Sequence, residues 1–66
     1  MVQKISEIVG VSKKSFDDAA QNAIDVAGKS VRGMKWFRVI EMEGGVKDAK
    51  ITDYRTTIRL YFDYEE

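Results

Sequence analysis

The stretch from residue 50 to residue 64, KITDYRTTIRLYFDY, constrains the fold most, because it has the two-residue periodicity of a long β-strand. It is rich in β-branched and aromatic residues, which favour strands. Its even positions are mostly apolar: Tyr54, Thr56, Ile58, Leu60, Phe62 and Tyr64. Its odd positions are Asp53, Arg55, Thr57, Arg59, Tyr61 and Asp63. We therefore expect the even positions to face a hydrophobic core.

Residues 15–31 have a helical spacing instead. Their apolar residues form one stripe, three and four positions apart: Phe16, Ala19, Ala20, Ala23, Ile24, Ala27 and Val31. Ser15 is typical of a helix N-cap, and Asp17 and Asp18 place negative charge where the helix dipole favours it. Lys29 lies near the other end, and Gly33 fits the exit from the helix. We predict an amphipathic helix whose alanines allow close approach to a sheet.

Two further strands are predicted. Residues 2–9, VQKISEIV, alternate as a short strand that Gly10 is expected to end. Residues 34–42 form another, joined to residues 50–64 by a turn at Gly44 and Gly45. The chain is thus predicted to be one α+β domain over residues 1–66, with the order β-α-β-β. In this architecture a three-stranded antiparallel sheet packs on one helix.

The strand at residues 34–42 has apolar residues on both faces. Alternation places Phe37 and Val39 on one face, and it places four others on the opposite face: Met34, Trp36, Ile40 and Met42. One helix covers only one side of a sheet, and a domain of 66 residues is marginally stable alone. Because the chain has no Cys, disulfides cannot compensate. We therefore expect a homo-oligomer, with Trp36 facing another chain, a ligand, or both.

Composition excludes several functions. Eleven basic residues balance eleven acidic ones, so no net field attracts nucleic acid or a membrane, and neither is an expected partner. No apolar run is long enough for a signal peptide or a membrane span, and we expect a cytoplasmic protein. Without His or Cys there is no obvious catalytic residue, and the chain is not expected to be an enzyme. The sequence FDD at 16–18 is interpreted as helix charge, so no metal site is predicted.

Three segments resemble the dodecins, a family of small flavin-binding proteins: EIVGVSKKSFDDAAQNAIDVA, KSVRGMKWFRVIEMEG and ITDYRTTIRLYFDYEE. The resemblance implies a hollow dodecamer of β-α-β-β protomers with cubic symmetry. It also implies that flavins bind in antiparallel pairs at the two-fold axes, between symmetry-related tryptophans. Trp36 would then lie over an isoalloxazine ring and quench its excited state by electron transfer. The implied function is flavin storage that suppresses flavin photochemistry.

The resemblance also identifies candidate flavin-binding residues: Trp36, Arg55, Lys35, Glu41, Glu43 and Arg38. The family usually places Gln at position 55, where its amide contacts the flavin edge. Arg55 can donate to the ring carbonyls and favour an anionic flavin, but it cannot accept from the ring N–H. The alternative is a surface arginine paired with Asp53 or a glutamate.

The flavin itself is left open between FMN and riboflavin. Bacterial dodecins that hold a flavin phosphate tend to carry Arg where this chain has Glu43, whose carboxylate would repel a phosphate. If Arg55, Arg38 or Lys47 supplies the missing cation, FMN is preferred, which we expect. Otherwise Glu41 or Glu43 accepts from the ribityl hydroxyls of riboflavin.

Coenzyme A is a second possible ligand, because bacterial relatives bind it near the three-fold axes. Asp63 stands where those relatives carry Arg, which weakens this expectation. The remaining candidate phosphate partners are Lys4, Lys29 and Arg32.

Two alternatives to flavin storage are left open. A flavoenzyme would use Arg55 to tune a bound flavin, although a sandwiched flavin pair leaves no open face for a second substrate. A structural assembly domain would pack Trp36 against protein. A branch of the family that lacks the tryptophan has been linked to calcium, and Trp36 argues against that branch.

Overall fold

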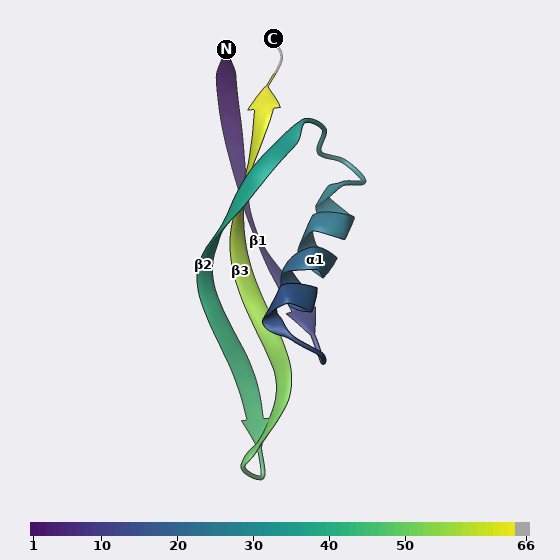
Figure 1. Ribbon diagram of the computed structural model, residues 1–66, viewed down its shortest axis with the longest axis vertical. Coiled ribbons are helices and arrows are strands. Elements are labelled where there is room, and N and C mark those ends of the chain that lie inside the picture. The colour runs from purple at the N-terminus through teal and green to yellow at the C-terminus, as the bar shows by residue number, and fades with distance from the viewer. Residues whose placement is uncertain (65–66) are drawn as a thin grey trace.

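The computed structural model describes residues 1–64, in the order β1 (Val2–Ser12), α1 (Phe16–Ala27), β2 (Met34–Lys47) and β3 (Lys50–Tyr64) (Figure 1). Residues 65 and 66, which the predicted domain included, lie outside the described residues. The strands form one antiparallel sheet in the order β1-β3-β2. Helix α1 lies against one face of this sheet (Figure 1). The predicted β-α-β-β architecture is confirmed.

The central strand β3 has the two faces that its sequence predicts. Thr56, Ile58 and Leu60 are buried on the face turned toward α1, which we call the inner face. The threonine hydroxyl donates to the carbonyl of Phe16 over 2.9 Å. The Phe16 ring also meets Tyr54 edge-on, with 5.0 Å between ring centroids. The even positions of β3 therefore hold the start of the helix on the sheet.

Strand β1 does not end at Gly10, so that prediction was wrong. It continues to Ser12, whose buried hydroxyl donates to Asp18 over 2.6 Å. A Cβ added at Gly10 would clash with the backbone carbonyl of Ala19. The glycine therefore marks the point where α1 approaches β1 most closely, as glycines inside strands often do.

Helix α1 begins as predicted and ends earlier than its apolar stripe suggests. The Ser15 hydroxyl accepts from the amide of Asp18 over 2.9 Å, which confirms the N-cap. The last helical residue is Ala27, and the amide of Gly28 donates to Ile24 at the C-cap. Gly33 lies beyond the helix with a φ of 74°, and its carbonyl accepts from the amide of Asp63. This glycine therefore turns the chain into β2 instead of ending the helix.

The turn between β2 and β3 lies farther along the chain than predicted. Gly44 and Gly45 are inside β2 and pair with β3, so the prediction of a turn there was wrong. The turn is formed by Asp48 and Ala49, which have φ values of 52° and 63°. Two consecutive positive φ angles are typical of the tight turn that suits the twist of a β-hairpin.

Two irregularities in β2 change which residues share a face. The register between β2 and β3 shifts between Met34 and Trp36 and again between Val39 and Glu41. Pairing with the even residues of β3 places four β2 side chains on the inner face, in addition to Gly44, which has none: Met34, Phe37, Val39 and Met42. The prediction that Met34 and Met42 accompany Trp36 was therefore wrong. Ile40 has no partner in the ladder, because it lies at the second shift.

The chain folds with little core and much surface. Its buried hydrophobic residues are Ala19, Ala20, Ala23, Ile58 and Leu60. It is elongated, 51 × 19 × 12 Å, with a radius of gyration of 13.6 Å, whereas about 11 Å is usual for this length. The accessible surface is 5067 Å², against roughly 4,200 Å² for a compact monomer of this mass. This excess surface is typical of a subunit that is covered by others.

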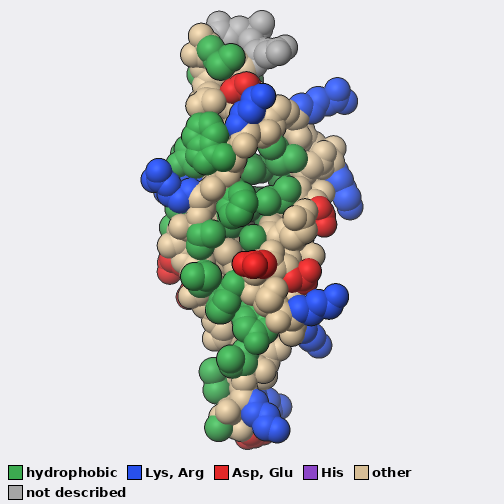
Figure 2. Space-filling model, in the orientation of Figure 1, with side chains coloured by type: hydrophobic (Ala, Val, Ile, Leu, Met, Phe, Trp, Pro, Cys, Tyr) green, Lys and Arg blue, Asp and Glu red, His purple; other side chains and the backbone are tan. Residues whose placement is uncertain are grey.

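Much of the exposed apolar surface lies along β2. Helix α1 packs mainly on β1 and β3, so it leaves the inner face of β2 largely uncovered. Phe37 and Val39 are each 43% exposed, and Met42 is 61% exposed. Figure 2 shows hydrophobic side chains gathered over β2 and between β2 and the helix, with Lys and Arg side chains mostly toward the margins and the two ends. Within the described residues, no helix is long and apolar enough to cross a membrane.

Candidate functional site

The face of the sheet turned away from α1, which we call the outer face, carries the single tryptophan. Trp36 pairs with Tyr61 of β3, an odd position, and therefore lies on the outer face as predicted. The two rings are stacked, with centroids 4.6 Å apart and planes inclined by 10°. Trp36 remains 47% exposed. Tyr61 thus covers one side of the indole and leaves the rest accessible.

Tyr61 was not among the site residues predicted from the sequence. The sequence does contain an indication of its role, because Tyr61 is an aromatic residue among the charged and polar residues at the odd positions of β3. Its partner depended on the register of β2, which the first irregularity sets. The stack holds the indole flat against the sheet, because offset parallel rings at this distance attract each other.

Two arginines form the adjacent row of the outer face. Arg38 of β2 pairs with Arg59 of β3. Nη2 of Arg59 lies 3.3 Å from Oε1 of Glu7, on β1. Hydrogen bonding with Tyr61, and then with Glu7, raises the pKa of Arg59 above its ordinary value. Arg59 is a permanent cation beside the aromatic stack, because a guanidinium does not deprotonate in proteins.

Arg55 lies on the same face but far from the stack. It is six residues from Tyr61 along β3, or about 20 Å at the rise of a strand. Its Nη2 lies 3.3 Å from Oδ2 of Asp53, and its partner on β2 is Glu43. The pairing with Asp53 is the alternative that the sequence had left open. One protomer therefore does not bring Arg55 to Trp36.

The other candidate flavin residues divide between these two regions. Lys35 is next to the stack, and its Nζ lies 3.7 Å from Oδ2 of Asp63. Glu41 pairs with Thr57, between the arginine row and the row of Arg55 and Glu43. Lys47 lies at the far end of the hairpin, opposite Lys50. Only Lys35 and Arg38 are therefore close to Trp36 along the strand.

The candidates for coenzyme A lie at the opposite end of the molecule from the hairpin. Lys4 pairs with Phe62, which also pairs with Met34 at the start of β2. Nζ of Lys4 lies 3.8 Å from the ring centroid of Tyr64, in a cation–π contact. Lys29 and Arg32 belong to the connection between α1 and β2. The three cations share one end of the fold, but no phosphate-binding cradle is formed by these contacts.

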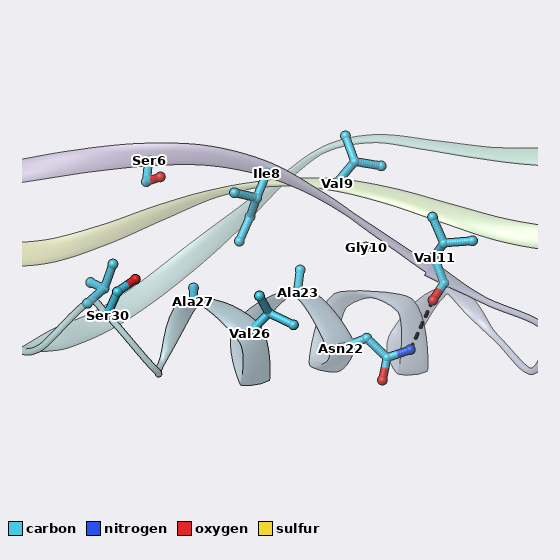
Figure 3. Close-up of a pocket in the computed structure, with 11 residues that line it drawn as sticks. Ser6, Ile8, Val9, Gly10, Val11, Asn22, Ala23, Val26, Ala27 and Ser30 are labelled. Atoms are coloured by element: carbon cyan, nitrogen blue, oxygen red, sulfur yellow. Dashed lines mark hydrogen bonds between the residues drawn. The ribbon is translucent and has the colours of Figure 1, made fainter.

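One hollow of the fold lies apart from the tryptophan, which is not among its lining residues. It is a groove of about 510 Å³ between β1 and α1, where the Asn22 amide donates to the carbonyl of Val11 over 2.9 Å (Figure 3). Its other lining residues include Ile8, Ala23 and Val26, and none is charged. Such a groove beside an edge strand is typical of a surface that contacts protein. A smaller hollow of about 280 Å³ lies between α1 and β2.

Among residues 1–64, no three Asp or Glu side chains lie close enough together to hold a metal ion. The outer face instead offers an exposed indole, a stacked phenol and a row of guanidinium groups. This combination is suited to a flat aromatic ligand that carries negative charge.

Comparison with known proteins gives consistent matches over nearly the whole chain. The family model described as Dodecin matches residues 2–65. A protein of Thermus thermophilus named Dodecin is 34% identical, over 98% of this chain and 94% of its own length. A protein of Mycobacterium tuberculosis named Calcium dodecin is 34% identical, over 92% of this chain and 86% of its own length. The solved structure of dodecin from Streptomyces coelicolor superimposes with a TM-score of 0.94 at 29% identity, covering 98% and 93% of the two chains.

Proposed function

This chain belongs to the dodecin family, and from that membership we propose that it binds a flavin against Trp36 and stores it. The isoalloxazine ring lies on the side of the indole turned away from Tyr61. The single observation that supports this most is the geometry of Trp36, which is held flat by a stacked tyrosine and remains half-exposed.

The stacked indole suits storage because it supplies contact area without a reactive group. A ring held by its neighbour loses little conformational freedom when a second ring stacks on it. Indole is also a good electron donor, so a flavin in contact with it should lose its fluorescence. We propose no turnover, since the groups beside the stack are an ion-paired lysine and arginines. The bound flavin is FMN or riboflavin.

We propose that the binding unit is an oligomer, and specifically a dodecamer. The excess surface, the small core and the uncovered inner face of β2 support assembly. At about 20 Å apart along the sheet, Trp36 and Arg55 can contact one flavin ring only when they come from different copies of the chain. Coenzyme A is a further possible ligand, at the end of the fold that carries Lys4, Lys29 and Arg32.

The ligand is tested by titrating FMN and riboflavin into the purified protein while flavin fluorescence is followed. We expect saturable quenching by the natural chain. Trp36→Ala should weaken binding roughly tenfold to a hundredfold, which is the usual range for one stacked aromatic. Trp36→Phe is the matched control, because phenylalanine keeps a stacking ring but is a poor electron donor. It should retain part of the affinity and lose most of the quenching.

Two outcomes would contradict the proposal. Fluorescence that stays unchanged at micromolar protein would exclude flavin storage. Equal affinities of the natural chain and Trp36→Ala would place the flavin elsewhere. Assembly is measured separately by light scattering on a sizing column, where a particle of 7.5 kDa would exclude the oligomer.

A further inference from the structure

Two positive charges lie directly opposite each other on the outer face, at Arg38 and Arg59. Like charges at facing positions of neighbouring strands destabilise a sheet. The chain compensates only one of them, because Glu7 contacts Arg59 at 3.3 Å. Among residues 1–64, Arg38 has no acidic group within 4.0 Å. The row formed by Glu7, Arg59 and Arg38 therefore carries a net positive charge.

Arg59 is held in place by Glu7, to whose Oε1 its Nη2 donates over 3.3 Å. Its guanidinium carries a positive charge, because arginine does not deprotonate in proteins. Its Nε is covered, yet it has no hydrogen-bond acceptor among the described residues. The guanidinium is thus a fixed cation that retains a donor without a partner, and Arg38 opposite is exposed. A pair of this kind is suited to an anion that accepts from both arginines.

The arginine row lies immediately beside the aromatic stack. Arg38 and Arg59 are each two residues from Trp36 and Tyr61, which corresponds to about 7 Å along the strands. A ring on Trp36 would therefore have its own polar edge, or the end of its ribityl chain, within reach of the guanidinium groups.

We infer that Arg38 and Arg59 together bind the negative charge of the flavin that stacks on Trp36. This inference rests on the proposed function and specifies the charge of the ligand. The charge can come from the phosphate of FMN or from the ring of a reduced, anionic flavin. The positive charge next to the ring thus comes from two residues. Only one of them, Arg38, was predicted from the sequence.

The other cations of the outer face are less suited to this role. Arg55 is paired with Asp53 and lies opposite Glu43, so an anion there would meet two carboxylates. Lys35 contacts Asp63, which also accepts from the amide of Gln3 over 3.0 Å. Each of these cations is thus neutralised locally, whereas the arginine row is not.

The experiment compares the dissociation constants of three ligands: oxidised FMN, oxidised riboflavin and, under anaerobic conditions, reduced riboflavin. The proteins are the natural chain, Arg38→Gln, Arg38→Lys and Arg59→Gln. Lys13→Gln is the matched control, because it removes the same charge from an exposed position outside the outer face. Circular dichroism and the sizing column verify that each variant is folded and assembled.

We expect the natural chain to prefer a charged flavin over oxidised riboflavin by about tenfold, the effect of one charge-assisted contact. Arg38→Gln should remove this preference and change the affinity for oxidised riboflavin less than twofold. Arg38→Lys should restore part of it, and Lys13→Gln should leave it intact. A preference for FMN identifies the phosphate as the source of the charge, and one for reduced riboflavin identifies the ring.

Two results would overturn the inference while leaving flavin binding intact. One is equal affinity of the natural chain for all three ligands. The other is a preference that survives in both Arg38→Gln and Arg59→Gln. If no flavin binds the natural chain at all, the proposed function fails first, and the two failures are thereby distinguished.

Discussion

The inner and outer faces of the sheet use the same strands for opposite purposes. On the inner face of β3, Thr56, Ile58 and Leu60 are buried by the helix. On the outer face, Tyr61 and Arg59 alternate with them along the strand and reach toward other strands without being buried. The residues that stabilise the protomer and those proposed to bind the ligand are therefore immediate neighbours in sequence.

The difference shows how a chain this small separates folding from binding. Helix α1 contributes alanines to the inner face, so its backbone approaches the sheet and needs only a few large residues to close the core. Within residues 1–64 the only helix lies on the inner face, and the outer face holds exposed aromatic and charged groups. Substitutions on the inner face should therefore change the free energy of unfolding, and those on the outer face should mainly change ligand affinity.

The largest effect is expected at Ile58, which is fully buried. Ile58→Ala should lower the free energy of unfolding by about 3 kcal/mol, because it leaves a cavity between α1 and the sheet. Chemical denaturation at a fixed protein concentration measures this. The neighbouring outer-face substitution Thr57→Ala should cost less than about 0.5 kcal/mol. If both variants lose a similar free energy of unfolding, the proposed difference between the inner and outer faces is contradicted.

The next effect is expected at Gly10, where the helix approaches β1. Gly10→Ala should destabilise the protein by about 2 kcal/mol, because the new methyl group would displace the Ala19 carbonyl. Val9→Ala, on the outer face of the same strand, serves as the control and should be milder. A thermal melt that does not distinguish the two variants would show that the helix shifts at no cost.

A smaller effect is expected at Tyr61, on both the free energy of unfolding and the flavin affinity. Tyr61→Ala should lower the free energy of unfolding by about 1 kcal/mol, which is the value of one aromatic pair. Flavin affinity should fall several-fold, because the indole is no longer held flat, while Tyr61→Phe should keep most of it. Tighter flavin binding by Tyr61→Ala would mean that the flavin competes for the side of the indole that Tyr61 covers.

The smallest effect is expected at the turn, which belongs to neither face. Ala49 has a φ of 63°, a conformation that glycine adopts without strain. Ala49→Gly should therefore raise the free energy of unfolding by about 0.5 kcal/mol, after the greater freedom of glycine in the unfolded chain is counted. Flavin affinity should not change, and a change in affinity would connect the hairpin end to the binding site.

Local patterns predicted the parts of the fold that depend on one element at a time. The helix stripe as far as Ala27, the Ser15 cap and the alternation of β3 were correct, because each depends on one local hydrogen bond or on burial against a single neighbour. The faces of β2 were wrong at Met34 and Met42, since bulges are set by pairing and leave no signal in the periodicity. Gly10 was misread because its role depends on how closely the helix packs.

The candidate site was predicted less completely than the fold, for a related reason. Trp36 was identified because it is the only tryptophan and alternation places it on the strand face turned away from the helix. Arg59 and Tyr61 were missed because their importance comes from facing Arg38 and Trp36 across the sheet. Such partners are fixed by register, which two separate stretches of sequence determine together.

The two irregularities of β2 each add one residue to the strand, and together they exchange the two faces of the short segment between them. On either side of them, at Met34 and Met42, even-numbered residues face the helix, but in the segment 36–39 the parity is reversed. The indole of Trp36 reaches the outer face only because this short segment pairs with β3 in a register that is offset by one residue from that of the flanking segments. Deleting one residue at either irregularity should move the neighbouring side chains of β2 to the opposite face of the sheet, because a one-residue slip exchanges the two faces of a strand.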